Sequence, residues 1–166
     1  MSQGEDYGSG IEMETMRGRD YPAIRQFTVF LENRVGVLLG INRRFRGTKV
    51  KILALSIIDS TECCIVRFVL SHPEQGREIL ESAGLAMIES DLIAIELSDI
   101  EQPLLEVFSA LLRAEVNLVQ AYPLMVPRSE KTIVAIMVDN IDSGQQTLSD
   151  QGFRLITENE LMDMSE

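Results

Sequence analysis

The spacing of apolar residues along this 166-residue chain alternates between strand-like and helix-like periods. Phe27, Val29 and Leu31 recur at every second position and predict a strand, and a helical spacing follows from 37 to about 46. Beyond this helix, the pattern predicts strands over 50–58 and 63–70, a helix that Pro73 opens and Gly84 closes, and a strand over 85–89. The order of these elements is βαββαβ.

The same order then repeats. The pattern predicts a strand over 92–97, a helix over 103–113, strands over 117–124 and 132–138, a weaker helix over 141–151 and a strand over 153–156. A shift of 66 residues (99 minus 33) superposes Asn33 on Asp99 and Lys51 on Asn117. We therefore expect an α+β chain with a flexible, Gly-rich tail over 1–23, one unit over 24–90 and a second over 91–162. The residues from 158 to 166 have the composition of an acidic, solvated tail.

Several predicted strands are apolar on both faces, as the run from Val50 to Ile58 shows. A sheet with helices on one face should instead alternate apolar and polar residues. The second face is thus expected to meet another protein surface, which favours a homodimer or larger assembly. Leu55 is the side chain that we assign to this free face.

Composition narrows the range of functions. The formal net charge of -11 opposes binding to nucleic acid or to an anionic membrane. No apolar run is long enough to span a membrane, and the first residues do not resemble a secretory leader, so the expected location is the cytoplasm. The sequence contains two adjacent cysteines, Cys63 and Cys64, and one histidine, His72. These residues do not have the spacing of metal ligands, so we expect no metal site and no cofactor. No nucleophile–base, phosphate-loop or dinucleotide motif is present, so we do not expect an enzyme.

The segment Glu32-Asn33-Arg34-Val35-Gly36-Val37-Leu38 joins the first strand to the first helix. Glycine in such a turn allows crowded or left-handed backbone, and the first amides of a helix have no internal partner. These amides carry the positive end of the helix dipole, which suits a small carboxylate. The segment is the best candidate site in the sequence, although a turn of this kind often only begins a helix.

This segment resembles the signature loop of the ACT domain, a small ligand-sensing module, with Val35 where the family usually has proline. The resemblance extends over about residues 24–162 as two ACT repeats. It implies two ferredoxin-like βαββαβ repeats side by side, which form an eight-stranded antiparallel sheet with helices on one face.

In ACT proteins that bind amino acids, the loop after the first strand of one module faces the start of the second strand of another. The resemblance therefore implies one ligand site between the two repeats, formed by Asn33, Arg34, Val35, Gly36, Val37, Leu38, Asn117 and Leu118. In the reciprocal site, Asp99 and Glu101 would repel a carboxylate, and Lys51 could pair with Asp99.

The expected function is non-catalytic sensing of a free amino acid or similar small carboxylate. Two alternatives stay open. The chain could be a regulatory subunit that acts in trans on an amino-acid biosynthetic enzyme, like the small subunit of acetolactate synthase, or a purely structural dimerisation module.

Overall fold

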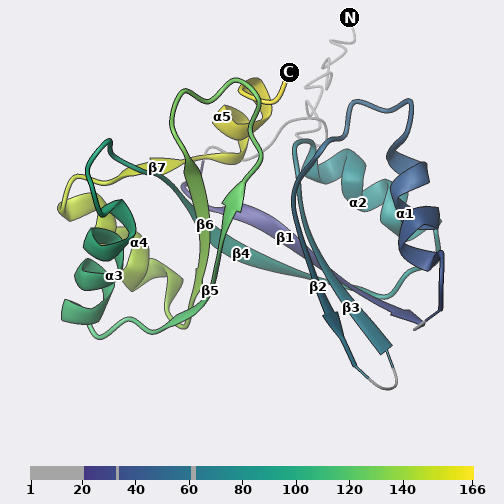
Figure 1. Cartoon of the computed structure of the whole chain (residues 1–166), viewed down its shortest axis with the longest axis horizontal. Coiled ribbons are helices and arrows are strands. Elements are labelled where there is room, and N and C mark those ends of the chain that lie inside the picture. Colours follow the sequence, from purple (N-terminus) through teal and green to yellow (C-terminus); the bar gives the residue numbers. More distant parts are fainter. Residues whose placement is uncertain (1–20, 33, 61–62) are drawn as a thin grey trace, which may run out of the picture.

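The structure is a computed structural model that describes residues 21–32, 34–60 and 63–166. Figure 1 shows two lobes joined by long strands. In chain order the elements are β1 (Ile24–Glu32), α1 (Val37–Phe45), β2 (Ile52–Asp59), β3 (Cys63–Leu70), α2 (Pro73–Ser82), β4 (Met87–Glu96), α3 (Pro103–Arg113), β5 (Leu118–Leu124), β6 (Ile133–Val138), α4 (Ile141–Asp150), β7 (Arg154–Ile156) and α5 (Glu158–Asp163). The order confirms the α+β class and the tandem arrangement. Most of the tail expected over 1–23 falls outside the described residues.

The strands form one antiparallel sheet in the order β2-β3-β1-β4-β6-β5, with β7 also paired to β4. Over the described residues this sheet has seven strands, rather than the eight that were expected. The fourth strand of the first unit and the first strand of the second are one continuous strand, β4. Its first half pairs with β1 and its second half with β6 and β7. The boundary between the two units was expected at residues 90 and 91, but 89–91 contain no turn-forming glycine or proline, and the strand continues through them.

Each unit has the ferredoxin-like strand order once β4 is counted in both. The first unit is β2-β3-β1-β4 and the second is β5-β6-β4-β7. Because one strand belongs to both units, no flexible linker separates them. The two units are therefore held in a fixed relation by backbone hydrogen bonds rather than by side-chain contacts alone.

Helices α1 to α4 share one face of the sheet, as expected. Phe27 of β1 and Phe68 of β3 belong to the core below α1 and α2, while Ile93 and Ile95 of β4 belong to the core below α3 and α4. Side chains alternate along a strand, and Met87, which packs on the first of these cores, lies on the same side of β4 as Ile93 and Ile95.

The opposite face of the sheet curls so that its two halves cover each other. This third core takes Leu53 from β2, Val69 from β3, Ala94 from β4 and Leu124 from β5. The Met125 amide also donates to the Leu53 carbonyl at 2.7 Å, which ties the end of β5 to β2. Much of the apolar face that was expected to meet another protein is therefore buried within the chain.

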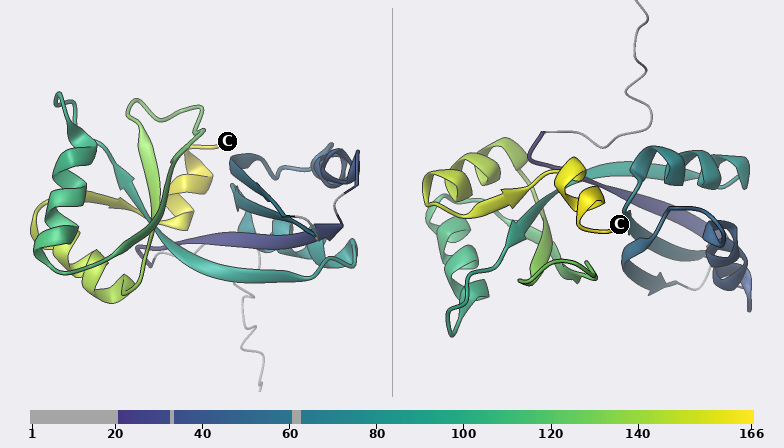
Figure 2. Two further views of the ribbon diagram at one scale, coloured as in Figure 1. Left: turned by 60° about the horizontal axis from the view of Figure 1, so that its bottom comes forward. Right: turned by 90° about the horizontal axis from the view of Figure 1, so that it is seen from above.

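Helix α5 packs against this same face, so not every helix lies on one side of the sheet. Figure 2 shows α5 over the middle of the molecule, between the two pairs of helices. Leu161 is part of the third core, and Thr157 and Glu160 form a capping box that begins the helix. The prediction of a solvated tail over 158–166 was wrong, because this capping signal was overlooked.

An apolar patch of the helix-free face stays exposed at the far end of the first unit. It consists of Phe30, Ile58 and Ile88, which are 39%, 44% and 55% exposed. Leu55 is not part of it, because it pairs with Phe68, which faces α1 and α2. The assignment of Leu55 to the free face was therefore wrong, since a register shift between Ile52 and Ala54 moves the later residues of β2 to the other side.

A buried ionic network joins α5 to the first unit. Glu158 accepts hydrogen bonds from the Arg25 amide at 2.9 Å, from Nε at 2.8 Å and from Nη2 at 3.0 Å. Arg25 also pairs with Glu74 of α2, and its Nη1 lies 3.9 Å from Glu89 of β4. Burial alone would lower the pKa of Arg25, but the hydrogen bonds to Glu158 and Glu74 outweigh it and raise the pKa above its usual value.

In the part of the chain that the structure describes, the helices are all too short or too polar to cross a membrane.

Candidate functional site

The turn between β1 and α1 has the backbone geometry that its glycine predicts. Gly36 has φ of 88°, in the left-handed region, and precedes the first residue of α1. The Gly36 carbonyl accepts the first helical bond, from Gly40 N–H at 2.9 Å. No side chain caps α1 and its first turn has no acidic residue. The Val37 amide donates to the Arg34 carbonyl at 3.3 Å, so among the described residues it is the amides of Leu38 and Leu39 that stay open to an anion.

The side chains of this turn divide into exposed and packed groups. Arg34, Val35 and Gly36 are exposed, whereas Val37 and Leu38 pack partly into the core below α1 and α2. Arg34 pairs with Glu32 at 2.5 Å, but both side chains are more than two-thirds exposed, so the pair adds little stability. The Arg34 guanidinium can therefore turn to a ligand carboxylate. Asn33 lies outside the described residues.

The second half of the expected site is at the start of β5. Asn117 donates its amide to Asp139 Oδ1 at 3.0 Å and accepts from the Asp139 amide at 3.1 Å. The backbone of Asn117 is thus fixed, and its exposed side chain has no partner among the described residues. Leu118 is half-buried and packs into the core below α3 and α4. Asn117 is the group here that could contact a ligand.

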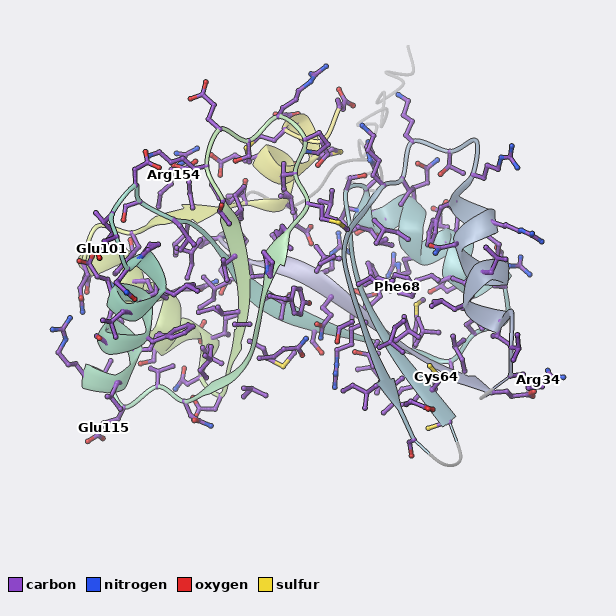
Figure 3. All side chains as sticks on the ribbon, viewed as in Figure 1. Arg34, Cys64, Phe68, Glu101, Glu115 and Arg154 are labelled. Carbon is purple, nitrogen blue, oxygen red and sulfur yellow. The ribbon has the colours of Figure 1, made fainter. Side chains whose placement is uncertain are left out.

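The structure places these two halves at opposite sides of one chain. Figure 3 shows Arg34 at the outer edge of the first lobe and Glu115, two residues before Asn117, at the outer edge of the second. The β1–α1 turn and the start of β5 therefore do not meet within one copy of the chain. A site that contains both needs a second copy.

The residues of the reciprocal site are also separated from their expected partners. Lys51 donates a hydrogen bond from Nζ to the carbonyl of Ser165, after α5. Asp99 is exposed in the loop before α3 and has no ion pair among the described residues. The two groups do not form the ion pair that the sequence suggested.

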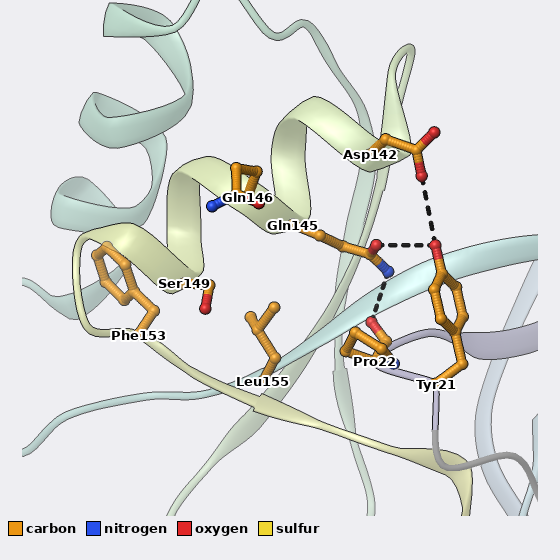
Figure 4. A pocket seen from close by; sticks show the side chains of 8 residues that line it. All are labelled: Tyr21, Pro22, Asp142, Gln145, Gln146, Ser149, Phe153 and Leu155. Carbon is orange, nitrogen blue, oxygen red and sulfur yellow. Dashed lines mark hydrogen bonds between the residues drawn. The ribbon is translucent and has the colours of Figure 1, made fainter.

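A hollow of about 480 Å³ lies between α4, β7 and the start of the described chain. Figure 4 shows its lining side chains, Tyr21, Pro22, Asp142, Gln145, Gln146, Ser149, Phe153 and Leu155. Gln145 is its buried polar group. It accepts from the Tyr21 hydroxyl at 2.9 Å and donates to the Pro22 carbonyl at 2.7 Å. Because these bonds already use both ends of the amide, the hollow anchors residues 21 and 22 and gives no sign of a ligand.

The described residues contain no cluster of three or more His, Cys, Asp or Glu side chains that could hold a metal ion. Cys63 and Cys64 are both free, as their adjacent positions predicted. The basic group formed by Lys49, Lys51 and His72 was missed from the sequence, because these residues meet only where β2, the start of α2 and the C-terminal residues come together.

Comparison with known proteins gives a consistent result for the fold. The family described as ACT domain pair matches residues 22–165. The structure is similar to protein BT0572 from Bacteroides thetaiotaomicron, with a TM-score of 0.75 and 21% identity over 84% of this chain and 96% of that one. It is also similar to the regulatory subunit of aspartate kinase from Thermus thermophilus in its ligand-free form, with a TM-score of 0.53 and 12% identity over 78% and 93%. No curated protein sequence matches the chain significantly.

Proposed function

The chain belongs to the ACT domain pair family, and from this premise we propose that it is a non-catalytic regulatory protein that senses a free amino acid. The observation that carries the proposal is the β1–α1 turn. It combines a left-handed glycine, a helix start without a side-chain cap and an exposed guanidinium. The match to the ACT domain pair family covers residues 22–165 and so includes this turn. These groups are donors suited to a ligand carboxylate.

The strand order supports a site shared between two copies. β2 and β5 are the last strands at the two ends of the sheet, and the bond between Leu53 and Met125 joins only the start of β2 to the residue after β5. The later part of β2 and the start of β5 therefore keep free edges. β1 and β2 both run antiparallel to β3, so the β1–α1 turn lies at the end of β2. If β2 of one copy pairs antiparallel with β5 of a second, the end of β2 comes beside the start of β5. The turn then faces Asn117 of the second copy.

Exposed apolar side chains on the same strands support this pairing. Ile57 of β2 and Val119 of β5 are 48% and 58% exposed. Free edges with apolar side chains are rarely left open to solvent in stable proteins. Pairing in a homodimer would cover them, and the two-fold symmetry of such a dimer would create two equal sites, or one per chain.

The chemistry assigned to each half is complementary. The amides of α1 and the Arg34 guanidinium would bind the ligand carboxylate, and the Asn117 amide oxygen would accept from the ligand ammonium. Asn33 adds a second amide in this proposal. Val35, Val37, Leu38 and Leu118 would bound the pocket through their apolar groups.

The test is a thermal-shift screen of the whole chain against the twenty amino acids, followed by calorimetry with any that stabilises it. A ligand at 100 times its Kd should stabilise the fold by about 2.7 kcal/mol. Asn117→Ala should weaken binding by about 1 to 3 kcal/mol without unfolding the protein, and Lys51→Ala should leave amino-acid binding unchanged. Equal weakening by the two variants, or two ligands per chain, would contradict the assignment.

A second candidate function is regulation of a separate enzyme. The similarity to the regulatory subunit of aspartate kinase from Thermus thermophilus favours it, because the match covers 93% of that regulatory subunit. In this case the sensor would act as a subunit of an amino-acid biosynthetic enzyme. Co-purification of a catalytic subunit with the untagged protein would establish this function, and a sensor that purifies alone from its native cells would contradict it.

A further inference from the structure

A second hollow, of about 300 Å³, lies where β2 begins, beside the junction of β3 and α2 and the residues after α5. Its lining is unusual for a chain with a net charge of -11, because it is mainly basic. The lining residues are Lys49, Lys51, His72, Ser165 and Glu166. A positive cluster on an acidic protein is a local feature that the overall charge does not explain.

The positive charges of this hollow are not balanced. Lys51 donates to the carbonyl of Ser165, which carries no net charge. Lys49 has no hydrogen bond or ion pair in the described part of the chain. The acidic side chain among the described lining residues is that of Glu166, whose Oε1 lies 3.9 Å from His72 Nε2 and which is 59% exposed. In the described part of the chain, neither ammonium group has a carboxylate partner.

Hydrogen bonds hold Lys51 and His72 in place before any ligand arrives. The buried Ser71 hydroxyl accepts from the Lys51 amide at 2.8 Å and lies 2.9 Å from His72 Nδ1. The Ser71 amide in turn donates to the Lys51 carbonyl at 2.9 Å. Because Nδ1 is engaged by Ser71, Nε2 is the ring nitrogen directed to Glu166. Lys51 and His72, which line the same hollow, would therefore lose little side-chain entropy when a ligand binds.

We propose that this hollow binds a small dianion, either inorganic phosphate or a dicarboxylate, between the ammonium groups of Lys49 and Lys51 and the Nε2–H of His72. The Glu166 carboxylate is the built-in competitor that the ligand displaces. The hollow offers donors and almost no acceptors, so it suits a doubly charged anion better than an amino acid, whose ammonium would find no partner once Glu166 has left.

The charge state of His72 supports coupling between anion and proton binding. Burial lowers the pKa of His72, and the charges of Lys49 and Lys51 lower it further, while the Glu166 carboxylate opposes them. An arriving dianion would add negative charge and favour the imidazolium. Anion binding should therefore raise the pKa of His72 and strengthen as the pH falls towards 6.5, the ordinary histidine value.

The experiment uses His72 as its own reporter, because the sequence contains one histidine and its imidazole resonance is unambiguous. The full chain is titrated with inorganic phosphate, and in a second arm with succinate, at constant ionic strength. The His72 shift is followed in the wild type, in Lys51→Met, in Glu166→Gln and in the control Lys131→Met. Lys131 pairs with Glu96 in the second unit and carries the same charge as Lys51.

We expect saturable shifts with at least one anion, and the tighter of the two arms identifies the class of dianion. Lys51→Met should weaken binding about tenfold, and Glu166→Gln should tighten it about threefold to tenfold, because its competing charge is lost. Lys131→Met should bind like the wild type. The proposal is overturned by shifts that do not saturate, by Glu166→Gln binding no tighter than the wild type, or by equal effects of Lys51→Met and Lys131→Met. Amino-acid binding is measured separately and does not enter this result.

Discussion

Glu158→Gln tests whether the buried ionic network fixes α5 to the first unit. Glu158 is 3% exposed and accepts three hydrogen bonds from Arg25. Glutamine keeps one acceptor oxygen for the Arg25 amide and Nε, but turns an NH2 group towards the Nη2 donor. The variant therefore loses one charge-assisted hydrogen bond, worth about 1.5 to 3 kcal/mol, together with one buried negative charge.

The size of the effect depends on how much charge Arg25 keeps. Breaking a fully buried ion pair costs about 3 to 5 kcal/mol. Here Glu74 and Glu89 stay near the guanidinium and offset part of that cost. We expect a loss of about 2 to 3 kcal/mol in the free energy of unfolding, with a lower Tm by about 5 to 10 °C for a chain of this size.

The assay is urea unfolding followed by circular dichroism, with Glu160→Gln as the matched control. Glu160 lies in the same helix and is 38% exposed, and glutamine can keep its capping interaction with Thr157. The control should change stability by less than about 1 kcal/mol. If both variants lose the same stability, or if Glu158→Gln loses less than about 0.5 kcal/mol, the network does not hold α5 in the way described.

Three further predictions follow from local geometry. Gly36→Ala should destabilise the fold by about 1 to 2 kcal/mol, because φ of residue 36 is positive. Gly40→Ala, in an open position inside α1, should instead stabilise the fold by about 0.5 to 1 kcal/mol. Chemical denaturation measures both variants, and equal effects would contradict the left-handed turn. If the exposed patch of Phe30, Ile58 and Ile88 is at an interface between copies, Ile58→Lys should weaken self-association without unfolding the monomer. Analytical sedimentation measures this, and an unchanged dimer would exclude the patch from the interface. Burial lowers the pKa of His72 in the folded protein, so as the pH falls the unfolded chain takes up the histidine proton first. The free energy of unfolding should therefore fall as the pH drops from 6.5 through the lower pKa of the folded state. His72→Gln should remove this pH dependence, and an unchanged dependence would assign it to other groups.

The repeated βαββαβ order was predictable because it depends on local periodicity and on turn residues such as Gly84 and Pro73, which act within a few positions. The count of strands was not. Whether residues 89–91 bend or continue depends on β1 and β6, which pair with the two halves of β4. Helix α5 could have been found from Thr157 and Glu160, whose spacing is that of a capping box.

The candidate site was predictable only in its parts. The Gly36 turn is local, so its left-handed backbone followed from the sequence. The separation of this turn from Asn117 did not, because it depends on how the sheet curls and on the contact between Met125 and Leu53. The grouping of Lys49 and Lys51 with His72 also required the tertiary structure, since the β3–α2 junction and the residues after α5 complete it.

A subunit-mixing experiment tests the shared amino-acid site most directly. Asn33→Ala and Asn117→Ala are each expected to weaken ligand binding at both sites of a homodimer, since each removes one contact group from both sites. Mixed dimers should recover one intact site, formed by the wild-type turn of one chain and the wild-type Asn117 of the other. After random exchange, calorimetry with the amino acid found in the screen should therefore count about one site for every four chains. If the mixture binds no more ligand than either variant alone, the two halves do not form one site across two copies.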